Sequence, residues 1–329
     1  MPSGEFGLIA RYFAPLSAGF PGAVNLQDDV ATITLSVGSE LAMTVDTMVS
    51  GVHFFFTDPA DLIARKLLRV NLSDLAASGA TPLCYLLAIS LDEAIDEDWI
   101  HAFAAGLALD QAKFGIALAG GDTTATPGPL TLSLTAIGEV PAGQAVRRSG
   151  AVATDDIWVT GTIGDAALAL MQIEYIGVPA VEAEWPELLN RYRLPQPRTG
   201  LGPALVGLAS AMADISDGLL ADLGHICTAS GIGAEIVFGD IPLSKAANDL
   251  FERTPDKRDD YVARVLTGGD DYELIFTATP AATAEIERRA ARCGIPVTRI
   301  GRTVERLGVR AFSADGDEIT VSSHGWQHF

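Results

Sequence analysis

Apolar residues along the chain follow two spacings, one typical of helices and one typical of strands. Near the N-terminus Phe6, Ile9 and Phe13 have helical spacing, which predicts a short amphipathic helix. Two longer helices are expected further on, one beginning at Asp58-Pro59 and reaching Ala77, the other capped by Asp96 and reaching Lys113. Apolar runs bounded by turn residues predict strands over 31–35, 41–47, 83–90, 116–119 and 130–140. The first half is therefore expected to be β-rich, with two crossover helices.

The second half shows the same alternation with shorter strands. Strands are predicted over 157–160, 211–215, 235–238, 273–276 and 297–300. Helices are predicted after Asp165 and over 185–192, 203–210, 219–229 and 281–292. The segment 141–154 between the halves is turn-rich, so we place a domain boundary there. The pattern predicts two domains, 1–140 and 141–329, of the α/β or α+β class.

The net charge of the chain limits the classes of molecule that it can bind. Lys plus Arg is 22 and Asp plus Glu is 42, so the formal net charge is 22 − 42 = −20. Such a chain should be repelled by nucleic acid, by anionic membranes and by ATP, unless metal ions invert the local field. Acidity for solubility is the competing explanation. Three scattered cysteines and no apolar run of membrane-spanning length favour a soluble cytoplasmic protein without a disulfide framework.

Nine aspartates gather in short clusters spread over most of the chain. Several follow an expected strand directly, where the chain enters a turn with Gly or Thr. Carboxylates gathered at one point repel each other unless cations lie between them, and oxygen ligands without a His/Cys cluster favour Mg²⁺. A single aspartate is more often only a cap or a turn residue. The ordered set suggests a phosphoryl-transfer site without a P-loop: Asp28, Asp29, Asp46, Asp74, Asp122, Asp214, Asp217, Asp270 and Asp271.

Two motifs give this hypothesis its local chemistry. Asp214 and Asp217 flank the Ser216 hydroxyl just before a predicted helix N-terminus, a position that favours anions. The alternative is that Ser216 or Asp217 is only the helix N-cap. The expected Gly120-Gly121-Asp122 turn would let backbone N–H groups approach a phosphate while the carboxylate holds metal, although such a sequence is usually only a turn.

Three further residues are candidates for ligand contact, each with a structural alternative. Arg148, beside Arg147 near the expected domain joint, could clamp phosphates or be a solvated surface residue. His53 could donate to a phosphate, although a lone histidine is more often structural. Trp326 could stack on an aromatic ligand or anchor the tail.

The ordered set of motifs resembles that of the thiamine-monophosphate kinases, members of the aminoimidazole ribonucleotide synthetase-like superfamily. The matching segments run nearly end to end. They are Gly4-Glu5-Phe6 with Leu8-Ile9, Asp28-Asp29, Val45-Asp46-Thr47, Gly51-Val52-His53-Phe54, Asn71 to Ala76, Gly120 to Thr124, Arg148-Ser149-Gly150, Asp214 to Leu219, Gly268 to Leu274 and Gly325-Trp326.

The resemblance implies direct transfer of the ATP γ-phosphoryl group to thiamine monophosphate, without a phosphoenzyme. It implies several Mg²⁺ ions, leaves a role for K⁺ open, and assigns three ligand sets. Metal would be held by Asp28, Asp29, Thr44, the carbonyl of Val45, Asp46, Asp74, Asp122, Asp214 and Asp217. Nucleotide would contact Gly121, Asp122, Arg148 and Ser216, with Asp122, Asp217 and Arg148 as the catalytic residues, and thiamine monophosphate would contact His53, Asp270 and Trp326. It also implies a homodimer that pairs the sheets of its N-terminal domains, with the active site in the cleft between domains.

Three positions depart from the family pattern, and two rival functions stay open. Asn25-Leu26-Gln27 stands where the family usually has Gly-x-Gly, Val45 replaces a hydroxyl residue, and Asp270 replaces a glutamate. One rival is another ATP-dependent synthetase of the superfamily. Selenophosphate synthetases fit less well, because residues 1–27 contain neither Cys nor Lys. The other rival is a catalytically weakened nucleotide-binding paralogue, which Gln27 and Val45 favour.

Overall fold

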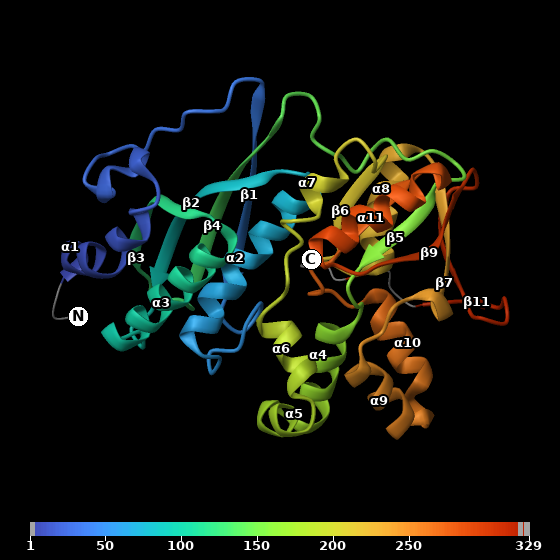
Figure 1. Ribbon diagram of the computed structural model, residues 1–329. Coiled ribbons are helices and arrows are strands. Elements are labelled where there is room, and N and C mark those ends of the chain that lie inside the picture. Colours follow the sequence, from blue (N-terminus) through green and yellow to red (C-terminus); the bar gives the residue numbers. More distant parts are fainter. Residues whose placement is uncertain (1–3, 322–324, 326–329) are drawn as a thin grey trace. The chain divides into compact units, whose positions relative to one another are not determined.

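The computed structural model describes residues 4–321 and 325, and the chain folds into two compact units (Figure 1). The N-terminal unit comprises Met1–Leu75 and Ala80–Gly143, and the C-terminal unit comprises Ala76–Gly79 and Gln144–Phe329. None of the helices that the structure describes combines the length and the apolar composition needed to cross a bilayer.

The N-terminal unit pairs four strands with two long helices. Short helical turns precede them, namely α1 (Gly4–Leu8), a π-helical turn (Ile9–Phe13) and 3₁₀ turns (Ala14–Ser17 and Pro21–Leu26). The main elements are β1 (Ser39–Val49), α2 (Ala60–Ala77), β2 (Thr81–Leu91), α3 (Glu97–Phe114), β3 (Ala117–Ala125) and β4 (Thr131–Pro141). As predicted, α3 begins where the Asp96 side chain accepts from the Trp99 N–H at 2.8 Å and ends at left-handed Gly115.

The sheet of this unit has the order β1-β4-β2-β3, with antiparallel pairs except for the parallel pair β2–β3. Its inner face is covered by the helices, as the bond from α3 residue Gln111 to the Tyr85 hydroxyl shows. Its outer face keeps large apolar side chains in contact with solvent. Met43 is 68% exposed, Val45 60% and Leu86 41%.

The strand predicted over 31–35 is wrong. These residues are extended but unpaired, apart from a bond from the Thr32 N–H to the Gly22 carbonyl. Ala31 and Ile33 pack on the outer face of the sheet around Cys84. The alternating pattern therefore reflects burial of every second side chain, not strand pairing.

The turn predicted at Gly120-Gly121-Asp122 is also wrong, because β3 continues through these residues to Ala125. An irregularity opposite Tyr85/Leu86 shifts the register, so that Gly121 pairs with Leu87. A Cβ on Gly121 would lie 2.0 Å from the Leu87 carbonyl oxygen. The glycine is needed for a close strand approach, not for a turn.

The C-terminal unit places helices around a seven-stranded sheet of order β11-β10-β7-β9-β5-β8-β6. Among the described strands of this sheet, only β7 and β10 pair in parallel. Its strands are β5 (Asp156–Thr160), β6 (Ala211–Asp214), β7 (Gly233–Val237), β8 (Leu274–Ala278), β9 (Val297–Val304), β10 (Gly308–Phe312) and β11 (Glu318–Ile319). Its α-helices are α4 (Asp165–Ile176), α5 (Val178–Glu184), α6 (Pro186–Arg193), α7 (Gly202–Leu205), α8 (Leu219–Ser230), α9 (Lys245–Arg253), α10 (Arg258–Thr267) and α11 (Thr283–Cys293).

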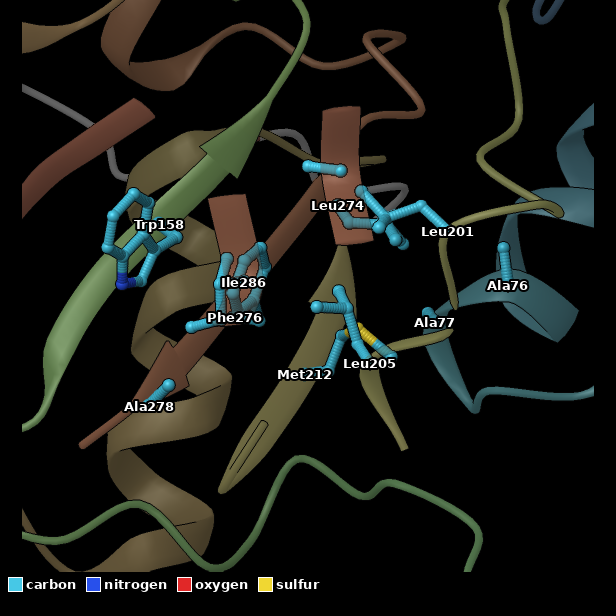
Figure 2. Packing of buried hydrophobic residues seen from close by; sticks show 11 residues of the cluster. Ala76, Ala77, Trp158, Leu201, Leu205, Met212, Leu274, Phe276, Ala278 and Ile286 are labelled. Carbon is cyan, nitrogen blue, oxygen red and sulfur yellow. The ribbon is translucent and has the colours of Figure 1, made fainter. Parts of the chain in front are cut away.

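The core of this unit is built where β5, β8 and β6 meet α11. Trp158 stacks on Phe276 with ring centroids 6.4 Å apart, and Met212 and Ile286 pack beside them (Figure 2). The register explains the grouping, because Phe276 pairs with Trp158 on one side and with Met212 on the other. This packing holds β6 in place up to Asp214, the first candidate site residue of the unit.

The helix predicted over 203–210 is correct only at its start. The helix α7 covers Gly202–Leu205, and the chain then turns through Gly207 at φ +77°. Val206 already has a non-helical ψ of 128°, so the helix ends at Leu205, before the left-handed Gly207. The other predicted strands and helices of the second half are present, and α5, α9, α10, β10 and β11 were not predicted.

Candidate active site

The N-terminal unit brings three of the predicted metal ligands together. Thr44 and Asp46 lie two apart on β1 and therefore point to the same, helix-covered face. The Thr44 hydroxyl donates to Asp74 of α2 at 2.5 Å, and the Asp46 N–H donates to the Asn71 side chain at 3.1 Å. Asn71 and Asp74 are three apart on one face of α2. The side chains of Thr44, Asp46 and Asp74 offer only oxygen atoms as metal ligands, so this set fits Mg²⁺.

Val45 lies on the opposite face of β1, with its side chain 60% exposed. Asp28 and Asp29 form an exposed bend, in which the Asp29 N–H donates to the Asp28 side chain at 2.8 Å. This bend follows three residues in the left-handed region, from Val24 (φ +49°) to Leu26 (φ +58°). Such a run is costly for side chains with a Cβ, so this loop stores backbone strain beside the aspartate pair.

The register places Asp122 apart from Thr44 and Asp46. Asp122 pairs with Ala88 and lies in the row of outward side chains, whereas Asp46 shares its row with buried Leu134 and Leu87. Within one copy of the sheet, Asp122 and Asp46 therefore point to opposite faces.

His53 is held in one tautomer. Its ring Nδ1 accepts from the Val49 N–H at 3.0 Å. The backbone of His53 is also held, because its N–H donates to the Val49 carbonyl and its carbonyl accepts from Lys66 Nζ. Because Nδ1 is an acceptor, the neutral ring carries its proton on Nε2. The imidazole can thus present an N–H to an anionic group.

The C-terminal unit places Ser216 and Asp217 in a bend between β6 and α8, as the motif predicts, with Asp214 buried at the strand end. The loop is held by Asp222, a residue that the sequence analysis missed. One oxygen of its carboxylate, Oδ2, accepts the N–H groups of Ser216, Asp217 and Gly218 at 3.0, 3.1 and 3.2 Å. An acidic residue in the first turn of a predicted helix was the signal that could have revealed it.

The environment of Asp222 is unfavourable for its charge. Burial, reinforced by the nearby Asp217 carboxylate, raises the pKa of Asp222 to about 7. The N–H groups of Asp217 and Ser216 and the charge of Arg148 act in the opposite direction. The charges of Asp217 and Arg148 therefore both act electrostatically on the Asp222 carboxyl group.

Arg148 is exposed and lies in a segment that the end of α8 holds. The Ser230 hydroxyl donates to the Arg148 carbonyl at 3.3 Å and accepts from the N–H groups of Gly150 and Ala151. The side chain is therefore left available for a ligand while its backbone is anchored.

Asp270 is joined directly to the same loop. Its N–H donates to the Ser216 carbonyl at 2.9 Å, and Tyr272 donates to the Ile215 carbonyl. Both Asp270 and Tyr272 have left-handed backbone angles, φ +70° and +50°. Trp326, the third predicted substrate contact, lies outside the described residues.

The chain is similar to known proteins over nearly its whole length. Two family models match it in order, "AIR synthase related protein, N-terminal domain" over residues 27–140 and "AIR synthase related protein, C-terminal domain" over 154–313. The thiamine-monophosphate kinase of Caulobacter vibrioides is 41% identical to it over 334 residues, covering 99% of this chain and 91% of that relative. The chain belongs to the thiamine-monophosphate kinase family.

Solved structures agree with this family. The thiamine-monophosphate kinase of Stenotrophomonas maltophilia K279a is 41% identical, with a TM-score of 0.83, over 93% of this chain and 97% of that one. A structure of AaThiL complexed with AMPPCP and TMP is 29% identical, with a TM-score of 0.75, over 100% of this chain and 98% of that one. These similarities confirm the predicted family, the two-domain α/β fold and the prediction of a kinase.

One cavity of the C-terminal unit lies away from these residues. It has a volume of about 640 Å³ in the C-terminal unit and is lined by α4, α6 and α9, including Asp165, Trp185, Arg191 and Lys245. It contains none of the predicted site residues. The candidate site is therefore defined by the motif residues and not by this cavity.

Proposed function

We propose that this chain transfers the γ-phosphoryl group of ATP directly to thiamine monophosphate, giving thiamine diphosphate and ADP. The observation that carries the proposal is the relative of the same fold complexed with AMPPCP, an ATP analogue, and with TMP. The relatives at 41% identity with the same kinase name support it.

In this proposal, Mg²⁺ is bound by Thr44, Asp46 and Asp74, which the N-terminal unit already gathers. Asp28, Asp29 and the Val45 carbonyl are assigned to the same set. Asp122 points to the other face of the sheet within one copy, so it is assigned to a metal ion apart from Asp46. Asp214 and Asp217 supply the carboxylates of the C-terminal unit. Bound Mg²⁺ would neutralise phosphate charge during transfer. It also explains how a chain of net charge −20 accepts two anionic reactants.

The nucleotide is assigned to Gly121, Asp122, Ser216 and Arg148. Arg148 suits a phosphate because its guanidinium stays charged and can make two parallel hydrogen bonds. Its exposure and its anchored backbone support this role. Asp122, Asp217 and Arg148 are the residues expected to matter most for the transfer itself.

Thiamine monophosphate is assigned to His53, Asp270 and Trp326. The fixed tautomer of His53 supports a hydrogen bond from Nε2 to the substrate phosphate. No general base is required, because a phosphate oxygen is already anionic when it attacks. The protein residues therefore bind and orient the reactants, and they need not remove a proton.

We also propose that the enzyme is a homodimer formed through the outer sheet face of the N-terminal domain, 1–140. Leu41, Met43, Val45 and Leu86 give this face four exposed large apolar side chains. Such a patch on a sheet favours a protein partner, and a second copy of the same face fits it by symmetry. Met43→Glu should then yield monomers in sedimentation analysis; an unchanged dimer would reject this interface.

A cytosolic location is part of the proposal. The cysteines Cys84, Cys227 and Cys293 are unpaired thiols in the structure, which is the state that a reducing compartment maintains.

The function is tested by ADP release with Mg·ATP and a panel of phosphorylated acceptors, with the product identified by mass. We expect release that depends on thiamine monophosphate, formation of thiamine diphosphate, and loss of both in Asp217→Asn. Release with another acceptor would favour a different synthetase of the superfamily. Nucleotide binding without release on any acceptor would indicate a weakened paralogue.

A further inference from the structure

Three metal-binding side chains meet at the start of α8. Asp217, Asp222 and His225 each have a ligand atom within 4.8 Å of the other two, and they are the one such group of His, Cys, Asp or Glu in the described part of the chain. Asp222 and His225 are three apart on α8 and so lie on the same face of the helix. Metal–ligand bonds of about 2.0–2.2 Å place any two ligand atoms within about 4.4 Å of each other. The observed spacing is thus close to that of a binding site.

The second observation concerns the other carboxylate oxygen of Asp222. Its Oδ2 holds three loop N–H groups, but its Oδ1 is buried and has no hydrogen-bond partner among the described residues. The whole residue is 0% exposed. A buried charged oxygen without a donor is costly, so native structures rarely keep one unless an ion or a ligand satisfies it.

The surroundings of this oxygen favour a cation. The Asp217 carboxylate and Asp222 each have a ligand atom within 4.8 Å of the other, so two acidic groups converge on one point. His225 is exposed and Asp217 is half-buried, which leaves an entry path from solvent. An ion held between the two carboxylates would relieve their repulsion.

We propose that Asp217, Asp222 and His225 bind one divalent transition-metal ion, with Mn²⁺ as the fitting example, and that Asp222 uses Oδ1 for it. Two carboxylates with one imidazole suit Mn²⁺ better than Mg²⁺, which prefers oxygen ligands alone. This site goes beyond the proposed phosphoryl transfer, with which it shares Asp217, and it requires neither nucleotide nor thiamine monophosphate.

The test uses the full-length protein and Mn²⁺ alone. Binding is followed by the loss of the free-ion EPR signal, and coordination by pulsed EPR, in which an imidazole ligand gives ¹⁴N modulation. We expect bound Mn²⁺ with ¹⁴N modulation in the wild type. In His225→Gln the modulation should vanish and the affinity should fall roughly 10–100-fold. His101→Gln, which changes a histidine outside the group, is the matched control and should behave like the wild type.

Asp222→Asn distinguishes the metal-binding role of Asp222 from its role in holding the loop 216–218. The amide oxygen can still accept the N–H groups of Ser216 and Asp217, while the NH₂ group replaces the oxygen assigned to the ion. We expect weaker Mn²⁺ binding with an unchanged melting temperature. Mn²⁺ bound without ¹⁴N modulation, or with equal affinity in His225→Gln, would overturn the site even if thiamine monophosphate-dependent ADP release is intact. Absence of that release, with the nitrogen signal present, would count against the proposed function alone.

Discussion

The backbone N–H of Asp270 donates to the carbonyl oxygen of Ser216 at 2.9 Å. The residue assigned to thiamine monophosphate is thus fixed by one hydrogen bond to the residue assigned to nucleotide. Gly269 directly precedes Asp270 in the chain. It has no room for a side chain, because a Cβ there would lie 2.1 Å from the Ser216 carbonyl oxygen.

Gly269→Ala should therefore separate the two loops. Overpacking of this kind costs about 1–3 kcal/mol, and a displacement of about 1 Å at reacting groups can lower turnover by roughly 100-fold. We expect a large loss of kcat/KM with a modest drop in Tm. Gly200→Ala is the matched control, because a Cβ there meets nothing within 4 Å. Equal kinetics in the two variants would show that the loops tolerate movement.

Arg148→Ala should raise the KM for ATP by roughly 10–100-fold, since a hydrogen bond to a charged group contributes about 1.5–3 kcal/mol. The neighbouring Arg147→Ala is the control, because Arg147 contributes its carbonyl to Met212 and this bond survives the substitution. Steady-state kinetics at saturating thiamine monophosphate provide the measurement. A KM shift of the same size in both variants would reject the clamp.

His53→Asn should distinguish the two nitrogens of this imidazole. The asparagine oxygen can replace Nδ1 as the acceptor for the Val49 N–H, but nothing replaces Nε2. We expect an unchanged Tm and a KM for thiamine monophosphate that rises about tenfold, the effect of roughly 1.4 kcal/mol. His53→Ala, which removes both roles, should lower the Tm as well. An unaltered KM in His53→Asn would return this residue to a purely structural role.

Asp110→Ala should unfold the N-terminal unit at a lower temperature. Asp110 is 1% exposed and accepts from Arg69 and Arg65, which ties α3 to α2. Removing one partner of a buried ion pair typically costs about 3–5 kcal/mol. Glu97→Gln, at the exposed pair with Arg11, should cost at most about 1 kcal/mol. Thermal unfolding followed by circular dichroism would compare the two, and equal losses would contradict this ranking.

Local chemistry predicted much of the fold. The Asp96 cap and the left-handed Gly115 define both ends of α3 through contacts within four residues, which a sequence displays directly. The strand predicted over 31–35 is absent. Apolar and polar residues do alternate there, and the apolar ones are partly buried, but the backbone of this segment pairs with no described strand. Whether an alternating segment pairs or only packs is decided by distant residues, and no local signal carries that information.

The candidate site divides in the same way. Asp214, Ser216 and Asp217 lie where the motif predicts, because a strand end followed by a helix start is a local arrangement. The face to which Asp122 points depends on one irregularity between β2 and β3, so a prediction from 120–124 alone could not obtain it. Asp222 was missed because its role depends on backbone groups, which look alike in every sequence.

The three N–H groups that Asp222 holds lie only four to six positions before it in the chain. Closing so short a loop loses little conformational entropy, and the contact can form as soon as the first turn of α8 exists. The loop 216–218, to which we assign phosphate contacts, is consequently preorganised by Asp222. Binding energy from the reactants is then available for the transition state, since it is not consumed in ordering this part of the backbone.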